Sequence, residues 1–362
     1  VEREREKERK RERGLGMDTV LLIICANRPD YLKRTLAEVV KYHPRNAVPI
    51  LISEDGESPA VAQIIAAAKS SLSLSSPSIP LIHTHHPAHN QPAENGYFRL
   101  CRHFKWALNQ VFSHPLASGL SLVQRVIILE EDLLIAPDFF EFFAALAPRL
   151  DHDDTLLAIS AWNDNGSSSL VKDATQLYRS DFFPGLGWMI TRRLWQELEP
   201  KWPRAYWDDW LREPVQRKGR HIIRPEVCRT FHFGEHGVSN AQYSQYLNSI
   251  KLNTETVKFT ELDLSYLDEE RWEKEYVNHV RQLPVTTMTS YHCYEGKNHE
   301  MRLNYDHFQG SSRSGSGPSF EDLAHWSGAM DNIKAGVPRT AYKGIVTVWK
   351  GNCKVHFTPV TL

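Results

Sequence analysis

The sequence predicts an α/β fold with a mostly parallel central sheet, and three apolar runs of strand length carry this prediction. They are VLLIICA at 20–26, VPILIS at 48–53 and VQRVIIL at 123–129. Polar or acidic residues follow each run, and stretches with helical periodicity come after them. Strands that alternate with helices at this spacing form parallel sheets covered on both faces. Ligands of such sheets bind beyond the carboxyl ends of the strands.

The first part of the chain divides into elements in a clear order. A turn at 27–30 follows the first apolar run, and an amphipathic helix then reaches Tyr42. The second run leads through an acidic turn into a helix from about Ser58. We expect the Ser-rich stretch at 69–79 to be a loop and PLIHTH at 80–85 to be a short strand.

Further elements are expected later in the chain. Apolar residues recur with helical spacing over 97–113, which predicts a helix before the third apolar run. The second half is more irregular and rich in aromatic residues. It closes with GIVTVW at 344–349 and CKVHF at 353–357 around Gly351-Asn352, which predicts a hairpin.

Composition excludes several classes of protein. The 43 basic residues nearly balance 44 acidic ones, so there is no basic excess to bind nucleic acid or an anionic membrane. No apolar run approaches the length of a membrane span, and no secretory signal is evident. The five cysteines lack CxxC spacing, which indicates neither a cysteine-based zinc site nor a disulfide scaffold, and at least one thiol is unpaired within the monomer. Serine-hydrolase and P-loop strings are missing.

Three carboxylates, Glu130, Glu131 and Asp132, directly follow the third apolar run. A hard divalent cation that bridges a nucleotide diphosphate needs oxygen ligands held in this way. The alternative is an acidic turn before a helix that starts near Pro137, because such turns are common at strand ends. Arg28 and the acidic turn at 54–56 follow the other two runs, so all these groups are expected at one edge of the sheet.

A second constellation is YWDDWLR at 206–212, where Asp208 and Asp209 lie between Trp207 and Trp210. A carboxylate beside large apolar rings suits a general base, and the rings suit the faces of sugars. An Asp that caps a helix, beside Trp residues of the core, is an equal alternative.

Two loops complete the set of candidate features. FHFGEHGVSNAQY at 231–243 has the composition of a mobile lid, although a plain connecting loop is the more frequent meaning. DFFPGLGW at 181–188 offers Gly185 and Gly187 for close backbone approach.

Taken together, the motifs resemble the N-acetylglucosaminyltransferase I family, glycosyltransferase family 13. The similarity runs in order from about Val20 to the final GVPRTAYKGIVTV and VHFTP segments. The strings that carry it are ISEDG, RHFKWAL, LEEDLLIAPDFFEFF, SAWNDNG, YRSDFFPGLGW, EPKWPRAYWDDW, FGEHGVS, KLN and LDLSYL.

The resemblance implies a GT-A type nucleotide-sugar-binding fold with a small C-terminal domain. Residues 1–17 are then a charged, disordered stem, and 18–255 form the catalytic domain. Within it, 18–150 bind the donor and 151–255 carry the acceptor and catalytic part, whereas 256–362 form the C-terminal domain.

The family's chemistry is an inverting, Mn2+-dependent transfer of GlcNAc from UDP-GlcNAc. The acceptor is the 2-hydroxyl of the α-1,3-linked mannose of an oligomannose N-glycan, which gives a β-1,2 linkage. The resemblance further implies a type II membrane protein of the Golgi lumen, whose anchor lies outside this sequence.

The resemblance assigns roles by position. Asp132 matches the metal ligand, Asp208 the catalytic base, and Ser239 the loop that donor binding orders. Asp209 is then an orienting residue or a helix cap. The remaining positions match residues that hold the donor: Arg28, Asp55 and His103 at the uridine and diphosphate end, Glu130 and Glu131 at the ribose and the transferred sugar, and Leu186 and Trp207 in the GlcNAc pocket.

The sequence departs from the family pattern in two respects. Glu131 replaces the middle Asp of the acidic triplet and is one methylene longer. Animal members carry two disulfides; here Cys25 fits one half-cystine, but Gly56 stands at its partner's position, and Ala158 and Ile222 stand at the other pair.

Two other functions remain open from sequence. One is transfer of β-1,2-linked GlcNAc to O-mannose on proteins; those relatives carry a lectin-like domain that nothing before Val20 could form. The other is a catalytically silent module that binds nucleotide sugar or glycan, against which the carboxylates at Asp132 and Asp208 argue.

Overall fold

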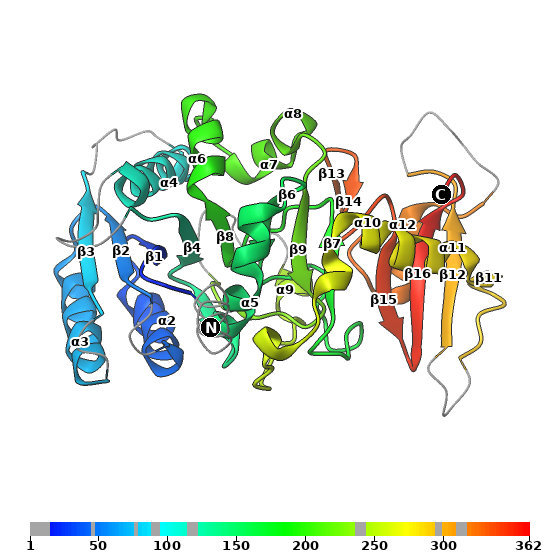
Figure 1. The fold of residues 1–362 in the computed structure, drawn as a ribbon, viewed down its shortest axis with the longest axis horizontal. Helices are drawn as coiled ribbons and strands as arrows, with labels where there is room; N and C mark the ends of the chain where they lie inside the picture. Colours follow the sequence, from blue (N-terminus) through cyan, green and yellow to red (C-terminus); the bar gives the residue numbers. More distant parts are fainter. Residues whose placement is uncertain are drawn as a thin grey trace, which may run out of the picture.

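The computed structural model describes residues 15–44, 48–75, 79–87, 95–113, 122–235, 244–293, 299–308 and 317–362. An eight-stranded sheet forms its centre, in the order β3-β2-β1-β4-β8-β6-β9-β7 (Figure 1). The first four are parallel, whereas β8 is antiparallel to β4 and β6, and β7 is antiparallel to β9. The strands are β1 (Thr19–Cys25), β2 (Ile50–Asp55), β3 (Leu81–His86), β4 (Arg125–Glu130), β6 (Leu156–Ser160), β7 (Leu177–Ser180), β8 (Trp188–Thr191) and β9 (His221–Pro225).

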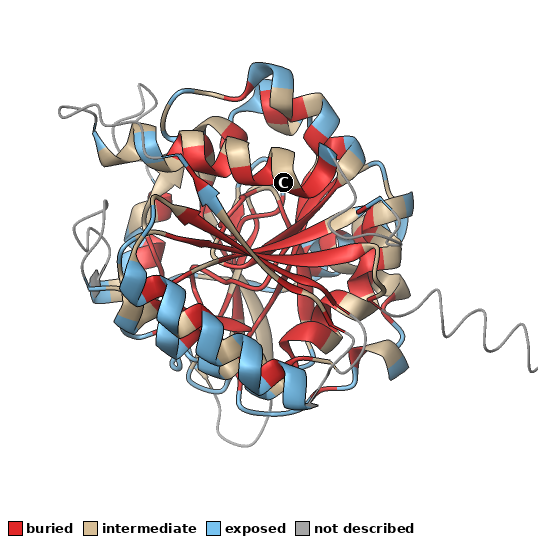
Figure 2. Cartoon of the chain, turned by 90° about the vertical axis from the view of Figure 1, so that its left-hand side faces the viewer, coloured by how far each residue is buried: buried red, intermediate tan, exposed pale blue. Residues whose placement is uncertain are grey.

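Helices cover both faces of this sheet, and Figure 2 shows the buried strands between them. A hydrophobic core lies on each face of the sheet, and alternate residues of β1 contribute to both. Leu21 and Ile23 pack toward α2, α3 and α5, whereas Leu22 and Ile24 pack toward α4 and α6. The predicted α/β class with a mostly parallel sheet is therefore confirmed. The larger helices are α2 (Pro29–Tyr42), α3 (Pro59–Ser75), α4 (Gly96–Ser113), α5 (Phe139–His152), α6 (Arg192–Leu198), α7 (Trp207–Arg212) and α12 (Phe320–Ser327).

Short elements fill the connections. They are η1 (Glu199–Lys201), α8 (Pro214–Arg217), α9 (Ser244–Leu247), η2 (Phe259–Glu261), η3 (Ser265–Leu267), α10 (Glu269–Trp272), η4 (Glu273–Val277) and α11 (Asn278–Gln282). A separate ribbon pairs β5 (Leu133–Ile135) with β10 (Thr230–His232) in antiparallel register. This ribbon brings the residues after β4 beside a segment about a hundred positions later in the chain.

The Ser-rich stretch predicted as a loop is mostly helical, so that prediction is wrong. Helix α3 continues to Ser75. The Ser70 hydroxyl donates to the Ala66 carbonyl, and the Ser73 hydroxyl donates to the Lys69 carbonyl, four residues earlier in each case. Leu72 is buried in the core. The serine hydroxyls are thus satisfied within the helix, and burial of Leu72 offsets the weak helix propensity of the stretch.

A second sheet of four strands, β11-β12-β16-β15, lies toward the C-terminus (Figure 1). Its strands are β11 (Val285–Thr286), β12 (His299–Tyr305), β15 (Val346–Lys350) and β16 (Cys353–Pro359), and a small ribbon pairs β13 (Ile333–Lys334) with β14 (Val337–Pro338). Strands β15 and β16 form the predicted hairpin, and Gly351 at its turn has φ +60°.

The boundary predicted at 255/256 stays a prediction, and the packing adds detail to it. Val257, Phe259 and Trp272 are buried in the core of the first sheet rather than in that of the C-terminal sheet. Phe259 contacts Phe142 of α5, with ring centroids 5.7 Å apart.

The cysteines form one disulfide among the described residues, between Cys293 and Cys353, and the other three thiols are buried and free. Ala158 and Ile222, which the resemblance places at the positions of a cystine of animal members, are register partners on β6 and β9. Among the described residues, no helix combines the length and apolar character that a membrane span requires.

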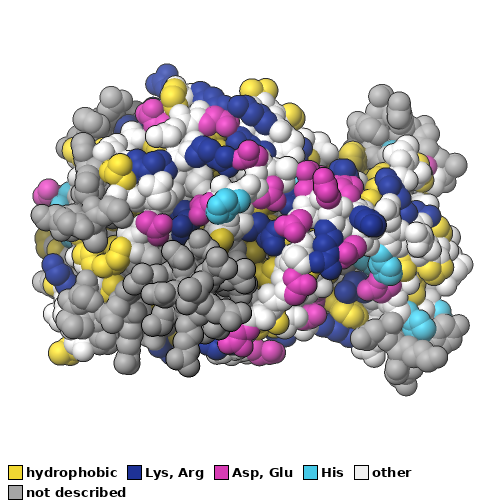
Figure 3. Space-filling view, viewed as in Figure 1, with side chains coloured by type: hydrophobic (Ala, Val, Ile, Leu, Met, Phe, Trp, Pro, Cys, Tyr) yellow, Lys and Arg dark blue, Asp and Glu magenta, His cyan; other side chains and the backbone are white. Residues whose placement is uncertain are grey.

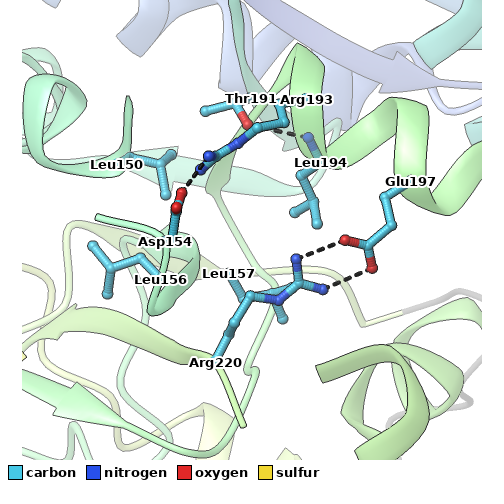
Figure 4. A pocket seen from close by; sticks show the side chains of 9 residues that line it. All are labelled: Leu150, Asp154, Leu156, Leu157, Thr191, Arg193, Leu194, Glu197 and Arg220. Carbon is cyan, nitrogen blue, oxygen red and sulfur yellow. Dashed lines mark hydrogen bonds and ion pairs between the residues drawn. The ribbon is translucent and has the colours of Figure 1, made fainter. Parts of the chain in front are cut away.

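One cavity lies away from the carboxyl ends of the central strands, and its charges are paired. Acidic and basic side chains are interspersed over the face in Figure 3. A cavity of about 200 Å³ opens near the N-terminal end of β6, and its charged groups pair among themselves: Arg193 with Asp154, and Arg220 with Glu197 (Figure 4). These pairs lie at the edge of the sheet opposite the carboxyl ends of β1, β2 and β4, and they leave no free charge for a ligand.

Candidate functional site

Arg28 and the acidic triplet meet where β1 and β4 end. The Arg28 Nε donates to Glu131 Oε1 at 2.6 Å, and its Nη1 lies 3.0 Å from Asp132 Oδ2. Arg28 precedes α2, whose first residue is Pro29, a residue preorganised for the first helical position. The strand register pairs Ile24 with Glu130, so the two loops after these strands must lie side by side. The predicted grouping at the sheet edge is therefore confirmed for these residues.

Asp132 is held by the β5–β10 ribbon. His232 lies across this ribbon, and its Nε2 is 3.6 Å from Asp132 Oδ2. Gly234 leaves the space that the carboxylate occupies, because a Cβ there would lie 2.6 Å from Asp132 Oδ2. Burial acts to raise the pKa of Asp132, but His232 and Arg28 outweigh burial and hold that pKa below its ordinary value. Asp132 is thus an ionised carboxylate, and in the described structure no side chain hydrogen-bonds its Oδ1.

Glu130 and Glu131 have different surroundings. The Glu131 carboxylate turns inward, where it accepts from Arg28 and from the Ala26 backbone N–H at 3.1 Å. Its predicted contact with ribose or sugar stays a prediction, and here it orients Arg28. Burial, reinforced by the charges of Asp132 and Asp208, raises the pKa of Glu130 to about 7. Asp208 is among the charges that act on Glu130, so the two predicted constellations lie within electrostatic range of each other.

Asp55 lies at the end of β2, on the face covered by α4. Its carboxylate accepts from His86 Nδ1 at 2.7 Å and lies 3.5 Å from Arg99. His103 of α4 stacks on His86, with ring centroids 5.4 Å apart, and its Nε2 lies 2.8 Å from the Ser53 hydroxyl. Burial lowers the pKa of His103 to about 4, so its imidazole is neutral at physiological pH. Asp55 and His103 are therefore brought together as predicted.

The segment Gly185-Leu186-Gly187 has positive φ at all three residues, +73°, +54° and +91°. Such strain in a leucine costs of order 1–3 kcal/mol and persists only where neighbours enforce it. Thr230 donates to the Leu186 carbonyl at 2.6 Å, and a Cβ on Gly187 would lie 2.6 Å from Thr230 Cγ2. The predicted close backbone approach is confirmed for Gly187 but not for Gly185, where a Cβ would meet nothing closer than 3.9 Å. The strained loop is thereby tied to the ribbon that holds Asp132.

Trp207 forms the neighbouring wall. Its ring stacks on Phe104 at 4.6 Å and on Trp188 at 5.4 Å, and a Cβ on Gly185 would lie 4.0 Å from it. Tyr206, just before it, has a left-handed backbone with φ +52°. Trp207 is buried beside the strained loop and stiffens it, and its predicted contact with the transferred sugar stays a prediction.

Asp208 and Asp209 begin helix α7 and share one cation. The Arg212 Nη1 lies 2.9 Å from Asp208 Oδ2 and 2.7 Å from Asp209 Oδ1. Asp209 has a second cation, Lys334, whose Nζ lies 3.2 Å from Oδ2. The Arg212 Nε donates to the Phe183 carbonyl at 2.8 Å, which fixes the guanidinium. Asp209 is therefore held through both oxygens, whereas Asp208 is held through one and is 41% exposed.

Three residues of the candidate site were not predicted from the sequence. His232, Gly234 and Arg212 were not singled out, although all three lie inside quoted motifs, and Arg212 follows Asp208 at the helical spacing of four residues. Ser239 and the segment 236–243 lie outside the described residues, so the predicted lid is not tested.

The fold and the site define a nucleotide-sugar-dependent glycosyltransferase of the GT-A type: an acidic cluster at the carboxyl edge of a mostly parallel sheet lies within electrostatic range of a further carboxylate beside buried aromatic rings. The chain belongs to the GNT-I family, whose sequence profile matches residues 3–361. It is 43% identical, over 337 residues, to the alpha-1,3-mannosyl-glycoprotein 2-beta-N-acetylglucosaminyltransferase of Arabidopsis thaliana, a match that covers 90% of this chain and 70% of the relative.

Solved structures show more distant similarity. The mannosyltransferase PcManGT from Pyrobaculum calidifontis, solved with GDP-Man and Mn2+, has a TM-score of 0.42 and 15% identity over 64% of this chain and 62% of its own. TarS of S. aureus has a TM-score of 0.38 and 13% identity over 60% of this chain and 37% of its own.

Proposed function

We propose that this protein transfers GlcNAc from UDP-GlcNAc to the 2-hydroxyl of the α-1,3-linked mannose of an oligomannose N-glycan. Inversion at the anomeric carbon gives a β-1,2 linkage. The observation that carries this proposal is the 43% identity to the Arabidopsis enzyme of that name across 90% of the chain. The arrangement of Arg28, Asp132 and Asp208 supports the chemistry.

Donor binding is assigned to the edge where β1, β2 and β4 end. Asp55 and the neutral His103 offer an acceptor and an imidazole to the uridine end, and Arg28 offers a guanidinium to the diphosphate. Glu130 and Glu131 lie nearest to the ribose and the transferred sugar. Leu186 and Trp207 line the pocket for that sugar, and Ser239 belongs to the segment proposed to close over it.

We assign Mn2+ as the cofactor, held by Asp132. The residues present fit this ion, because Asp132 is ionised, its Oδ1 lacks a hydrogen bond from the described side chains, and hard divalent cations take carboxylate oxygens. One protein carboxylate is sufficient where substrate phosphates and water complete the coordination. When bound, Mn2+ supplies positive charge that stabilises the leaving diphosphate.

Asp208 is assigned as the general base. It removes the proton from the mannose hydroxyl as that oxygen attacks the anomeric carbon from the face opposite UDP. A single displacement of this kind inverts the centre and needs no enzyme nucleophile. Arg212 orients Asp208 through one oxygen and leaves the other available for the hydroxyl, whereas Asp209 has both oxygens paired.

The test is transfer from UDP-GlcNAc with Mn2+ to an oligomannose N-glycan and, in parallel, to an O-mannosyl peptide, with the product linkage determined. We expect a β-1,2 product on the N-glycan that a chelator abolishes. Preference for the O-mannosyl peptide would replace this assignment with the related O-mannose activity. Donor binding without product on either acceptor would indicate a silent binding module.

A Golgi-lumenal location belongs to the same proposal. The Cys293–Cys353 disulfide supports it, since disulfides persist in oxidising compartments. Microscopy of the tagged full-length protein tests this location. We expect Golgi staining, and a cytosolic distribution would contradict the proposal.

A further inference from the structure

Three side chains with metal-binding atoms converge between β2 and β3, at the outer edge of the main sheet (Figure 1). Glu54 Oε2 lies 2.9 Å from His83 Nε2 and 3.5 Å from His85 Nδ1. All three ligand atoms lie within 4.8 Å of one another. Two atoms bonded at about 2.1 Å to a tetrahedral ion are about 3.4 Å apart. The separations of 2.9 Å, which is a hydrogen bond in the absence of an ion, and 3.5 Å lie on either side of that value.

The strand geometry explains the convergence. His83 and His85 are two positions apart on β3, so both point to the same face of the sheet. The register places His85 opposite Glu54 on the neighbouring strand. Asp55, the next residue on β2, points to the other face toward His86. The three-residue cluster is therefore separated by the sheet from the groups assigned to the uridine end of the donor.

The Glu54 carboxylate is only 1% exposed, yet no Lys or Arg in the described part of the chain forms an ion pair with it. Its Oε1 accepts from the Ser58 backbone N–H at 2.6 Å, which fixes the carboxylate and leaves Oε2 for the two imidazoles. A divalent cation at Glu54 Oε2 would compensate the charge of a buried carboxylate that no described Lys or Arg pairs.

The exposure of the two histidines and the types of ligand atom indicate which metal ion this cluster would bind. His83 is 18% exposed and His85 39%, so solvent reaches one side of the cluster and can supply the ion and a water ligand. Two imidazoles and one carboxylate form the ligand set of open zinc sites, whereas Mg2+ and Mn2+ prefer oxygen.

We propose that Glu54, His83 and His85 form a binding site for a divalent transition-metal ion of the zinc class, distinct from the manganese site at Asp132. Bound there, the ion links the edge strand β3 to β2. Through the contact between Glu54 and Ser58 it also fixes the start of α3. The inference stands on these contacts alone and does not depend on the proposed transferase activity.

The experiment measures Co2+ and Zn2+ binding to the chelator-treated full chain in an Asp132→Asn background, which weakens the other metal site. We expect one equivalent of Co2+ with the visible absorption of a four-coordinate site, displaced by Zn2+ but not by a tenfold excess of Mg2+. His83→Gln and His85→Gln should each weaken binding at least about tenfold. His279→Gln, which removes an exposed imidazole beside Glu300, should leave binding unchanged.

Unchanged affinity in both the His83 and His85 variants, or no binding in the Asp132→Asn protein, would overturn the proposal. A measurement without substitutions guards against misfolded variants: Zn2+ should protect His83 and His85, but not His279, from acylation by diethyl pyrocarbonate. Equal modification of all three with and without Zn2+ would also overturn it.

Discussion

The ammonium group of Lys334 lies 3.2 Å from the Asp209 carboxylate, although the two residues are 125 positions apart. This contact brings a charge from the C-terminal part of the chain to the carboxylate beside the proposed base. Together with Arg212 it outweighs the effect of burial and lowers the pKa of Asp209. The two adjacent carboxylates of α7 thus differ in their partners, since Asp209 pairs with two cations and Asp208 with one.

Asp208→Asn should lower kcat by about 10²–10⁴-fold, the usual contribution of a general base, and leave UDP binding intact. Asp209→Asn, the matched variant, should retain activity within about tenfold because Asp209 acts only through Arg212. Steady-state kinetics with calorimetric UDP binding would check this. Near-normal turnover of Asp208→Asn would transfer the role of base to Asp209.

Asp132→Ala should abolish the gain in UDP-GlcNAc affinity that Mn2+ provides, because the ion loses its proposed carboxylate ligand. Asp30→Ala removes an exposed carboxylate near Arg28 and serves as the control, with the metal dependence retained. Calorimetric titration with and without Mn2+ measures the effect. An undiminished Mn2+ effect in Asp132→Ala would exclude Asp132 as the ligand.

Gly187→Ala should destabilise the fold by roughly 2–4 kcal/mol, since the new Cβ meets Thr230 at 2.6 Å and φ is +91°. Gly219→Ala is the matched control, because Gly219 also has positive φ but nothing lies within 4 Å of its Cβ position. It should cost only about 1 kcal/mol. Denaturant unfolding would compare the two, and equal losses would show that strain rather than the contact dominates.

Glu197→Gln should destabilise the protein at neutral pH by less than about 1 kcal/mol, because the Glu197 pair with Arg220 is partly exposed. Burial acts to raise the pKa of Glu197, but Arg220 and Lys218 outweigh it and lower this pKa to about 2. A depressed folded-state pKa stabilises the fold above the unfolded value of about 4.3, and this stability is lost as pH falls toward 2. The difference between wild type and variant should therefore shrink over that range in denaturation curves recorded at several pH values. A difference in stability that stays constant over this pH range would contradict the prediction.

Replacing Cys293 and Cys353 together by Ser should lower the free energy of unfolding by about 4 kcal/mol, the loop-closure value for a separation of 60 residues. A reducing agent should destabilise wild type similarly and leave the double variant unaffected. Unfolding with and without reductant would measure this. A loss below about 1 kcal/mol would indicate that the C-terminal sheet holds the two strands without the bond.

Much of the fold was accessible from local patterns. The apolar runs placed β1, β2 and β4 within two residues of their observed bounds, and the hairpin near Gly351 was predicted correctly. The end of α3 was not, because the helix continues where the burial of Leu72 stabilises it. Propensity alone ranks such a stretch as a loop.

The sequence by itself determined the family, the class of fold and the edge of the sheet at which the polar residues gather. These features could be predicted because strand periodicity and the order of motifs depend only on residues that are close in the sequence. Only the tertiary structure decided that Glu131 turns inward to Arg28, that His232 supports Asp132, and that Lys334 holds Asp209. These contacts join residues about a hundred positions apart in the sequence. The distances between such residues are set by the packing of strands and helices against each other, which cannot be predicted from local sequence patterns.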